Sequence, residues 1–216
     1  MTTVPKYDII FLIVFLCARE RADGLKPYIS RSICSLLKGM ILMARRLNTA
    51  DLRSWIYTLR AGEEILLSGT VYSARDAAHK RFFALLEKGE PLPFDIKDAV
   101  IYYCGPTPAK PGMPIGSAGP TTSSRMDGFT PELLRLGLGA TVGKGGRSQE
   151  VCEAIRTHRS AYLCAMGGAG ALAAKSILSV VVVAFPELGC ESVKKMEFRD
   201  FPLIVGIDCN GGTLFE

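Results

Sequence analysis

The sequence predicts an α/β fold, a layered domain in which helices cover a largely parallel central sheet. Short apolar runs alternate along the chain with segments of helical periodicity, and this alternation is typical of layered α/β architectures. The chain has 216 residues, which suffices for one such domain with a sizeable core. Hydrophobic residues make up 48% of the chain and aromatic residues 8%, as in ordinary globular domains.

The first elements are indicated by their patterns and by their ends. Asp76–Lys88 has apolar residues on one helical face and is followed by a glycine, so we expect a helix there. Ala99–Cys104 is rich in β-branched and aromatic residues and ends at a Gly-Pro pair, which predicts a strand. Thr130 can cap a short helix over Pro131–Leu136, with proline in the first helical position.

The second half continues the alternation. Leu138–Val142 is a predicted strand that leads into a glycine-rich loop, and Ser148 can cap a helix that extends to about His158. The remaining expected elements are a strand at Ala161–Met166, a helix at Gly170–Ile177, a buried strand at Ser179–Phe185, and a hairpin of Leu203–Asp208 and Thr213–Phe215 around Asn210-Gly211-Gly212.

The net charge of +5 lies entirely in the first 46 residues, which hold eight Lys/Arg and three Asp/Glu. The remaining residues hold eighteen of each sign. A protein that binds nucleic acid is expected to carry a basic face on its folded body. The neutral body therefore predicts no nucleic-acid partner.

An apolar run, Ile9–Ala18, stands out near the N-terminus. Its ten residues are too few for a membrane-spanning helix, which needs about 20, so we expect no membrane anchor. A signal peptide is disfavoured because Asp8 adjoins the run and no small-residue cleavage site follows. The run could form a buried strand, but we favour an extension outside the domain over residues 1–46, and Met43 is a candidate for the true translation start.

The seven cysteines contain no Cys-x-x-Cys pair and no spacing typical of a zinc site. They are scattered singly among apolar neighbours, as buried thiols are in a reducing compartment such as the cytoplasm. We therefore expect no metal site and no cofactor-binding residues within this chain.

Three polar segments have the residue types that bind a small dianion. They are Ser73–Arg81, Gly119–Met126 and Gly143–Ser148. In the second segment, threonine hydroxyls can donate hydrogen bonds and Arg125 can grip a carboxylate with two parallel bonds. In the first, Arg75 stands at the start of the predicted helix, where backbone N–H groups also attract anions.

Together, these three segments resemble the β-type, C-terminal domain of the class I iron–sulfur fumarate hydratase and L-tartrate dehydratase family. The resemblance covers residues 47–216 and implies a swivelling-type β/β/α domain. It also implies a hydro-lyase that adds or removes water on a four-carbon dicarboxylate, most closely fumarate/S-malate. The resemblance implies a [4Fe-4S] cluster that the cysteines of an α-type partner subunit hold, in a hetero-oligomer of α2β2 type.

The resemblance also assigns roles to individual residues. Arg75, Thr121, Arg125 and Lys144 are expected to bind the substrate carboxylates. Thr122 is expected to remove the carbon-bound proton as the catalytic base.

Other interpretations stay open. Gly168–Ala173 fits the G-x-G-x-x-[GA] pattern of dinucleotide sites, follows a predicted strand and opens a helix, so a nucleotide-dependent oxidoreductase is a second hypothesis. The alternative for these small residues is close packing of helix and strand. A P-loop is excluded, because Gly145 stands where Ser or Thr is required after Lys144. Two further hypotheses about function are an L-tartrate dehydratase β subunit and a non-catalytic interaction module.

Overall fold

The computed structural model describes residues 44–215. The apolar run Ile9–Ala18 and the candidate start at Met43 lie outside these residues, and so does nearly all of the predicted extension 1–46. These interpretations stay predictions. From Arg46 onward the chain forms one compact unit. Within residues 44–215, no helix combines the length and the apolar character needed to cross a bilayer.

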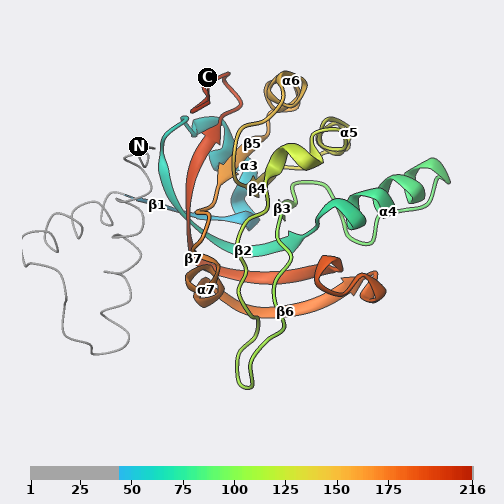
Figure 1. Cartoon of the computed structure of the whole chain (residues 1–216). Coiled ribbons are helices and arrows are strands. Elements are labelled where there is room, and N and C mark those ends of the chain that lie inside the picture. Colours follow the sequence, from blue (N-terminus) through green and yellow to red (C-terminus); the bar gives the residue numbers. More distant parts are fainter. Residues whose placement is uncertain (1–43, 216) are drawn as a thin grey trace, which may run out of the picture. The chain divides into compact units, whose positions relative to one another are not determined.

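The strands of the described chain form one sheet that closes on itself. Their hydrogen-bonded order is β1-β2-β3-β4-β5-β7-β6, and β2 also pairs with β7. The strands β2, β3, β4, β5 and β7 therefore make a closed five-stranded barrel, with β6 added outside it (Figure 1). The bounds are β1 (Arg45–Asn48), β2 (Glu64–Ser73), β3 (Val100–Tyr102), β4 (Ala140–Gly143), β5 (Ala161–Cys164), β6 (Ile177–Ala184) and β7 (Val193–Ile207).

The α/β class is confirmed, but the central sheet is mixed and not largely parallel. The pairings β2–β3, β3–β4 and β4–β5 are parallel. In contrast, β7 runs antiparallel to β2, β5 and β6. Because β7 has 15 residues, it reaches all three of these neighbours. The parallel portion, β2 to β5, nevertheless keeps its carboxyl ends at one edge, and this edge positions the candidate site.

Two buried clusters lie on opposite faces of the barrel strands. In β3, Val100 and Tyr102 belong to the first cluster, whereas Ile101 belongs to the second, as expected from the alternation of side chains along a strand. The first cluster fills the barrel, and the second lies between its outer face and a layer of helices. This layer consists of α4 (Asp76–Glu87), α5 (Thr130–Arg135) and α6 (Gln149–Thr157), which Figure 1 shows on the same side of the strands.

The two longest predicted helices are confirmed. α4 agrees with the predicted Asp76–Lys88 to within one residue, and α6 begins after Ser148, whose Oγ accepts a hydrogen bond from the Val151 N–H at 3.4 Å. The other helical elements are short: the 3-10 turns η1 (Thr49–Asp51), η2 (Ile56–Thr58), η3 (Ser123–Met126), η4 (Ala174–Ser176) and η5 (Pro186–Glu191), and the helices α3 (Leu52–Trp55) and α7 (Gly170–Ala173).

The strand predicted at Ser179–Phe185 exists as β6, but it is exposed and not buried. The exposed fractions of Val181 and Val182 are 61% and 48%, and Leu178 is also exposed. The continuous apolar run indicated a strand covered on both faces. In the structure β6 is an edge strand that pairs with β7 alone among the described strands, while the helices α4 to α6 cover the barrel.

Candidate functional site

The candidate residues lie on loops that follow the parallel strands. Arg75 comes two residues after β2, and Lys144 comes directly after β4. The Gly119–Met126 segment returns to the end of β3, where Pro120 forms an isolated bridge with Cys104. Because parallel strands end at the same edge of a sheet, the loops that follow them meet there.

Backbone hydrogen bonds fix Thr121 and Thr122 at the end of β3. The Thr121 N–H donates to the Tyr103 carbonyl at 2.7 Å. Thr122 has φ −60° and ψ 120° and stands directly before the turn η3. Thr121 is half-buried, whereas Thr122 is exposed. The Thr122 side chain is thus accessible to a ligand while its backbone is held in place.

Lys144 is paired with Thr122 through the backbone. The two residues form a parallel bridge, and the Ser123 N–H donates to the Lys144 carbonyl at 2.9 Å. The Lys144 side chain is exposed and lies over Gly167, where a Cβ atom would be 3.5 Å from the lysine Cδ. The structure therefore brings a threonine hydroxyl and a lysine, predicted from separate segments, to adjacent backbone positions.

Arg75 is half-buried at the start of α4. Its Nη2 lies 3.4 Å from Oε1 of Glu191 and 3.9 Å from Oδ2 of Asp76. A Cβ atom at Gly105 would be only 2.6 Å from the Arg75 Nη1, so the guanidinium rests directly on this glycine. These contacts hold the arginine in one orientation at the edge that also carries Thr122 and Lys144.

Arg125 reaches the same carboxylate as Arg75. Its Nε donates to Oδ1 of Asp76 at 2.9 Å, and its side chain is half exposed. Asp76 therefore connects the arginine of the first segment with the arginine of the second. All five predicted site residues lie at one edge of the barrel, and the structure joins Arg75 to Arg125 and Thr122 to Lys144. Their individual roles stay predictions.

Glu191 is a site residue that the sequence did not indicate. Its Oε1 contacts Arg75, and its Oε2 accepts a hydrogen bond from the Ala77 N–H at 3.0 Å, in the first turn of α4. Lys194 holds the turn η5, which ends at Glu191, because its Nζ donates to the carbonyls of Gly189, Cys190 and Ser192 and to the Ser192 hydroxyl. The sequence separation of Glu191 from Arg75 exceeds one hundred residues, so no local pattern could reveal the pair.

His79, one helical turn after Arg75, packs inside the protein and does not face a ligand. Its ring is fully buried against Phe82, Tyr103 and Phe129. Its Nδ1 lies 2.8 Å from the Arg75 carbonyl, which can only accept, so Nδ1 carries the proton. Burial lowers the pKa of His79 to about 4, and the ring is neutral at physiological pH.

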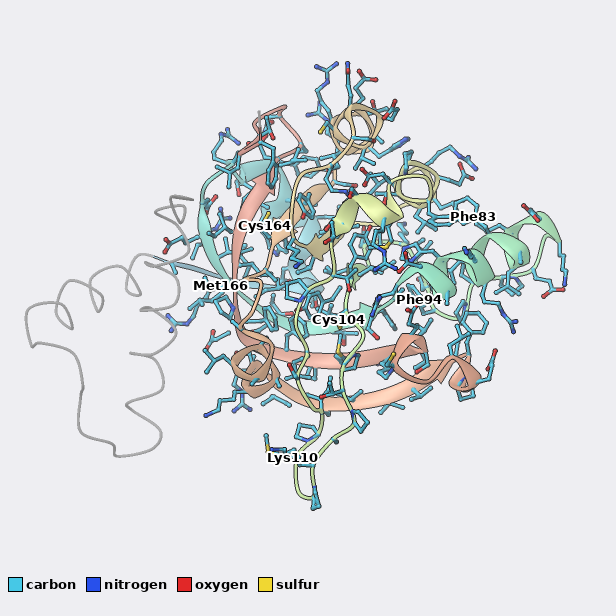
Figure 2. The ribbon with its side chains drawn as sticks, in the orientation of Figure 1. Phe83, Phe94, Cys104, Lys110, Cys164 and Met166 are labelled. Atoms are coloured by element: carbon cyan, nitrogen blue, oxygen red, sulfur yellow. The ribbon has the colours of Figure 1, made fainter. Side chains whose placement is uncertain are left out.

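Cys104 and Cys164 do not suit the ligation of an iron–sulfur cluster. Residues 44–215 contain no group of three or more His, Cys, Asp or Glu side chains close enough to hold a metal ion. Cys104 and Cys164 lie at separate places in the body (Figure 2). Burial raises the pKa of Cys104 to about 12 and that of Cys164 to about 11, which disfavours the thiolate that a metal requires.

The Gly168–Ala173 segment is used for packing. The helix α7 has only four residues, too few to form the phosphate-binding half of a dinucleotide fold. A Cβ atom at Gly170 would be 2.7 Å from the Gly119 nitrogen, and the Ala118 N–H donates to the Gly170 carbonyl at 3.0 Å. The small residues therefore let α7 support the loop that carries Thr121 and Thr122.

Several known proteins are similar in sequence to this chain. Fumarate hydratase 2 of Leishmania major is 41% identical over 158 residues, which cover 72% of this chain and 28% of that protein. The anaerobic class I fumarate hydratase of Escherichia coli K12 is 42% identical over 153 residues, again 28% of its length. A Methanocaldococcus jannaschii protein with the name "Putative L(+)-tartrate dehydratase subunit beta" is 39% identical over 164 residues, which cover 73% of this chain and 84% of that protein.

The chain thus spans about 28% of the length of the two fumarate hydratases. The family model described as the fumarase C-terminus matches residues 37–216. This match contains all three polar segments on which the resemblance was based. The chain belongs to the fumarase C-terminus family.

Proposed function

We propose that this chain is the β subunit of a hydro-lyase that reversibly adds or removes water on a four-carbon dicarboxylate, most closely fumarate and S-malate. One observation carries the proposal. The exposed Thr122 is held by a backbone bridge beside Lys144 and shares its loop with Arg125. This arrangement supports a role for Thr122 as an alcohol that works beside cations, at the edge where the loops of parallel strands meet.

The cations would first bind the substrate. A four-carbon dicarboxylate carries two negative charges, and Arg75, Arg125 and Lys144 supply complementary charges from three segments. The Thr121 hydroxyl adds a donor. An arginine can bind a carboxylate through two parallel hydrogen bonds and so fixes its orientation, whereas a lysine acts as a point charge.

The same cations would then help Thr122 to act as a base. A threonine hydroxyl is a weak base unless its anion is stabilised, and nearby positive charge favours the anion. In the dehydration direction, Thr122 would take the proton from the carbon next to a carboxylate, and the hydroxyl group would leave from the adjacent carbon. Negative charge builds up on that carboxylate in the transition state, where Arg125 and Lys144 are preorganised to stabilise it.

The rest of the enzyme would come from a partner. A relative named as a β subunit is covered over 84% of its length, which supports a β-subunit role for this chain. An α-type subunit would then hold the [4Fe-4S] cluster, in a cytoplasmic hetero-oligomer of α2β2 type.

L-Tartrate is a second candidate substrate, and the name of the M. jannaschii relative favours it. Tartrate carries one more hydroxyl group than malate. The five predicted residues would contact the carboxylates that both substrates share, so they do not distinguish between the two.

The test is anaerobic co-expression with a candidate α-type subunit, followed by assays of fumarate, S-malate and L-tartrate turnover. Thr122→Val should abolish turnover and leave folding and subunit binding intact, because valine has nearly the same shape but no hydroxyl. Ser124→Ala is the matched control, since Ser124 is an exposed hydroxyl in the same loop to which we assign no role. Near-normal turnover by Thr122→Val would remove Thr122 from the mechanism.

A further inference from the structure

Arg147 is a buried cation beneath the candidate site. Its side chain is 0% exposed, and its guanidinium carbon lies 5.4 Å from the centre of the Tyr103 ring and 5.0 Å from that of Tyr162. Burying a guanidinium is costly unless its donors are satisfied by hydrogen bonds and by an opposite charge. The hydrogen-bond partners of Arg147 therefore show which parts of the structure this buried side chain holds together.

The Arg147 guanidinium joins several segments. Its Nε donates to Oδ1 of Asp127 at 2.6 Å, its Nη2 to the Thr130 hydroxyl at 2.7 Å, and its Nη1 to the Thr141 hydroxyl at 3.2 Å. The other Asp127 oxygen accepts a hydrogen bond from the Ser148 N–H at 2.7 Å. Asp127 directly follows the turn η3, so this network ties the end of the Thr122–Arg125 segment to the start of α6.

Tyr162, one of the two rings against Arg147, ties the same two loops together nearer to the site. Its hydroxyl donates to the Gly145 carbonyl at 2.8 Å and lies 2.9 Å from Oγ of Ser123. Gly145 adjoins Lys144, and Ser123 adjoins Thr122. The ring that Arg147 covers therefore bridges the immediate neighbours of the proposed base and the proposed lysine.

The Lys144 loop has little stiffness of its own. Lys144 is followed by two glycines, and Gly145 has a φ of +79°, a conformation that glycine adopts at low cost. Glycine-rich backbone loses much conformational freedom when it is fixed. Arg147 stands at the end of this loop and anchors it to the barrel and to Asp127.

We propose that Arg147 is a positioning residue that sets the placement of Lys144 relative to Thr122. It acts through Asp127 and Tyr162 and, being fully buried, does not touch the substrate. Its effect on catalysis rests on the proposed hydro-lyase function, whereas its effect on the loops does not. A misplacement of about 1 Å can cost about 10²-fold in rate, so the loss of this anchor should lower kcat while the barrel stays folded.

The test compares Arg147→Lys with the unmodified full-length chain in two measurements. The first is amide hydrogen exchange at Ser123, whose N–H donates to the Lys144 carbonyl. We expect exchange at Ser123 to accelerate by about tenfold, the factor that corresponds to the loss of roughly one hydrogen bond, with unchanged exchange in the β2–β7 ladder. Lysine keeps the charge but lacks the planar fork that holds several partners.

The second measurement is the kcat and KM of the complex with the α-type subunit. We expect kcat to fall by about 10²-fold, with a smaller change in KM, because the groups that bind substrate remain present. Arg135→Gln is the matched control, since Arg135 is an exposed arginine whose Nε and Nη2 bind Glu132. It should leave both exchange and kcat unchanged.

If Arg147→Lys does not fold, Tyr162→Phe is the second variant for the same test. It removes only the hydroxyl that bridges Ser123 and Gly145. It should accelerate exchange at Ser123 in the same way. Unchanged exchange at Ser123 in these variants, or equal acceleration throughout the barrel, would overturn the proposal. If the unmodified complex has no hydro-lyase activity but exchange responds as expected, the proposed function fails and the positioning role of Arg147 stands.

Discussion

Asp76 and Arg125 come from different polar segments and meet in a close ion pair. The arginine Nε donates to Oδ1 at 2.9 Å, and its Nη2 lies 2.9 Å from Oδ2. Oδ2 lies 3.9 Å from Nη2 of Arg75 as well. One carboxylate thus stands between two arginines that would otherwise repel each other, and it fixes the approach of both to a ligand.

Asp76→Asn should raise the KM for the dicarboxylate by about tenfold, because both arginines lose the charge that orients them. The stability of the isolated chain should change by no more than about 1 kcal/mol, since Arg125 is half exposed and water screens the pair. Steady-state kinetics of the complex and urea denaturation would measure the two effects. Arg81→Gln, which breaks the exposed pair with Glu187, is the control. A lower KM for Asp76→Asn would show that Asp76 competes with the substrate.

Because of His79, the free energy of unfolding should decrease on mild acidification. Burial lowers the pKa of its ring in the folded protein to about 4 from the ordinary 6.5, so between these pH values the unfolded chain binds the proton and the folded protein does not. The contribution of His79 is complete above pH 6.5 and is lost progressively as the pH falls to about 4, in total about 3 kcal/mol.

Urea denaturation of the chain at a series of pH values from 7.5 to 4.5 would test this expectation. His79→Gln should have a flatter dependence of unfolding free energy on pH than the unmodified chain. His158→Gln removes the other histidine, which is only half-buried, and is the matched control for the substitution. Equal slopes for the unmodified chain and His79→Gln would contradict the prediction.

Gly143→Ala should destabilise the protein by about 1–3 kcal/mol, as overpacking of a buried site typically does. The new methyl group would collide with the Ser123 Oγ and would lie 3.1 Å from the Tyr103 ring. Gly128→Ala is the control, because a methyl group there has no neighbour within 4 Å. Removing the obstructing atom with Ser123→Ala should recover part of the loss, which denaturation of the single and double variants would measure. No recovery would mean that the collision is not the cause.

Local patterns predicted the elements that position the site. The helix over Asp76–Lys88, the cap at Ser148 and the strand over Ala99–Cys104 depend on neighbours in sequence, and the structure has all three. The site residues were predicted because their three segments together match one family, although Arg75 or Lys144 alone would have been ordinary surface residues.

The pairing of strands that are distant in the sequence cannot be predicted from local patterns. The first half of β7 contains Lys194, Lys195, Glu197 and Arg199 and was not predicted as a strand, although Met196 and Phe198 are buried between them. Its partners in β2 lie far away in the sequence. No local sequence pattern could therefore predict that the barrel closes. The ion pair of Glu191 with Arg75 was missed for the same reason. The exposure of β6 was missed because an apolar run does not indicate what covers it.

Barrel closure has a consequence for how the chain is made. β2 pairs along most of its length with β7, for example Ile65 with Leu203, yet the ribosome releases β2 long before β7 has been synthesised. A nascent polypeptide stalled before Val193 would leave β2 and β5 each with an open edge, which invites misassembly during translation. Final folding must therefore await the last strand, as expected where distant contacts dominate and slow the reaction.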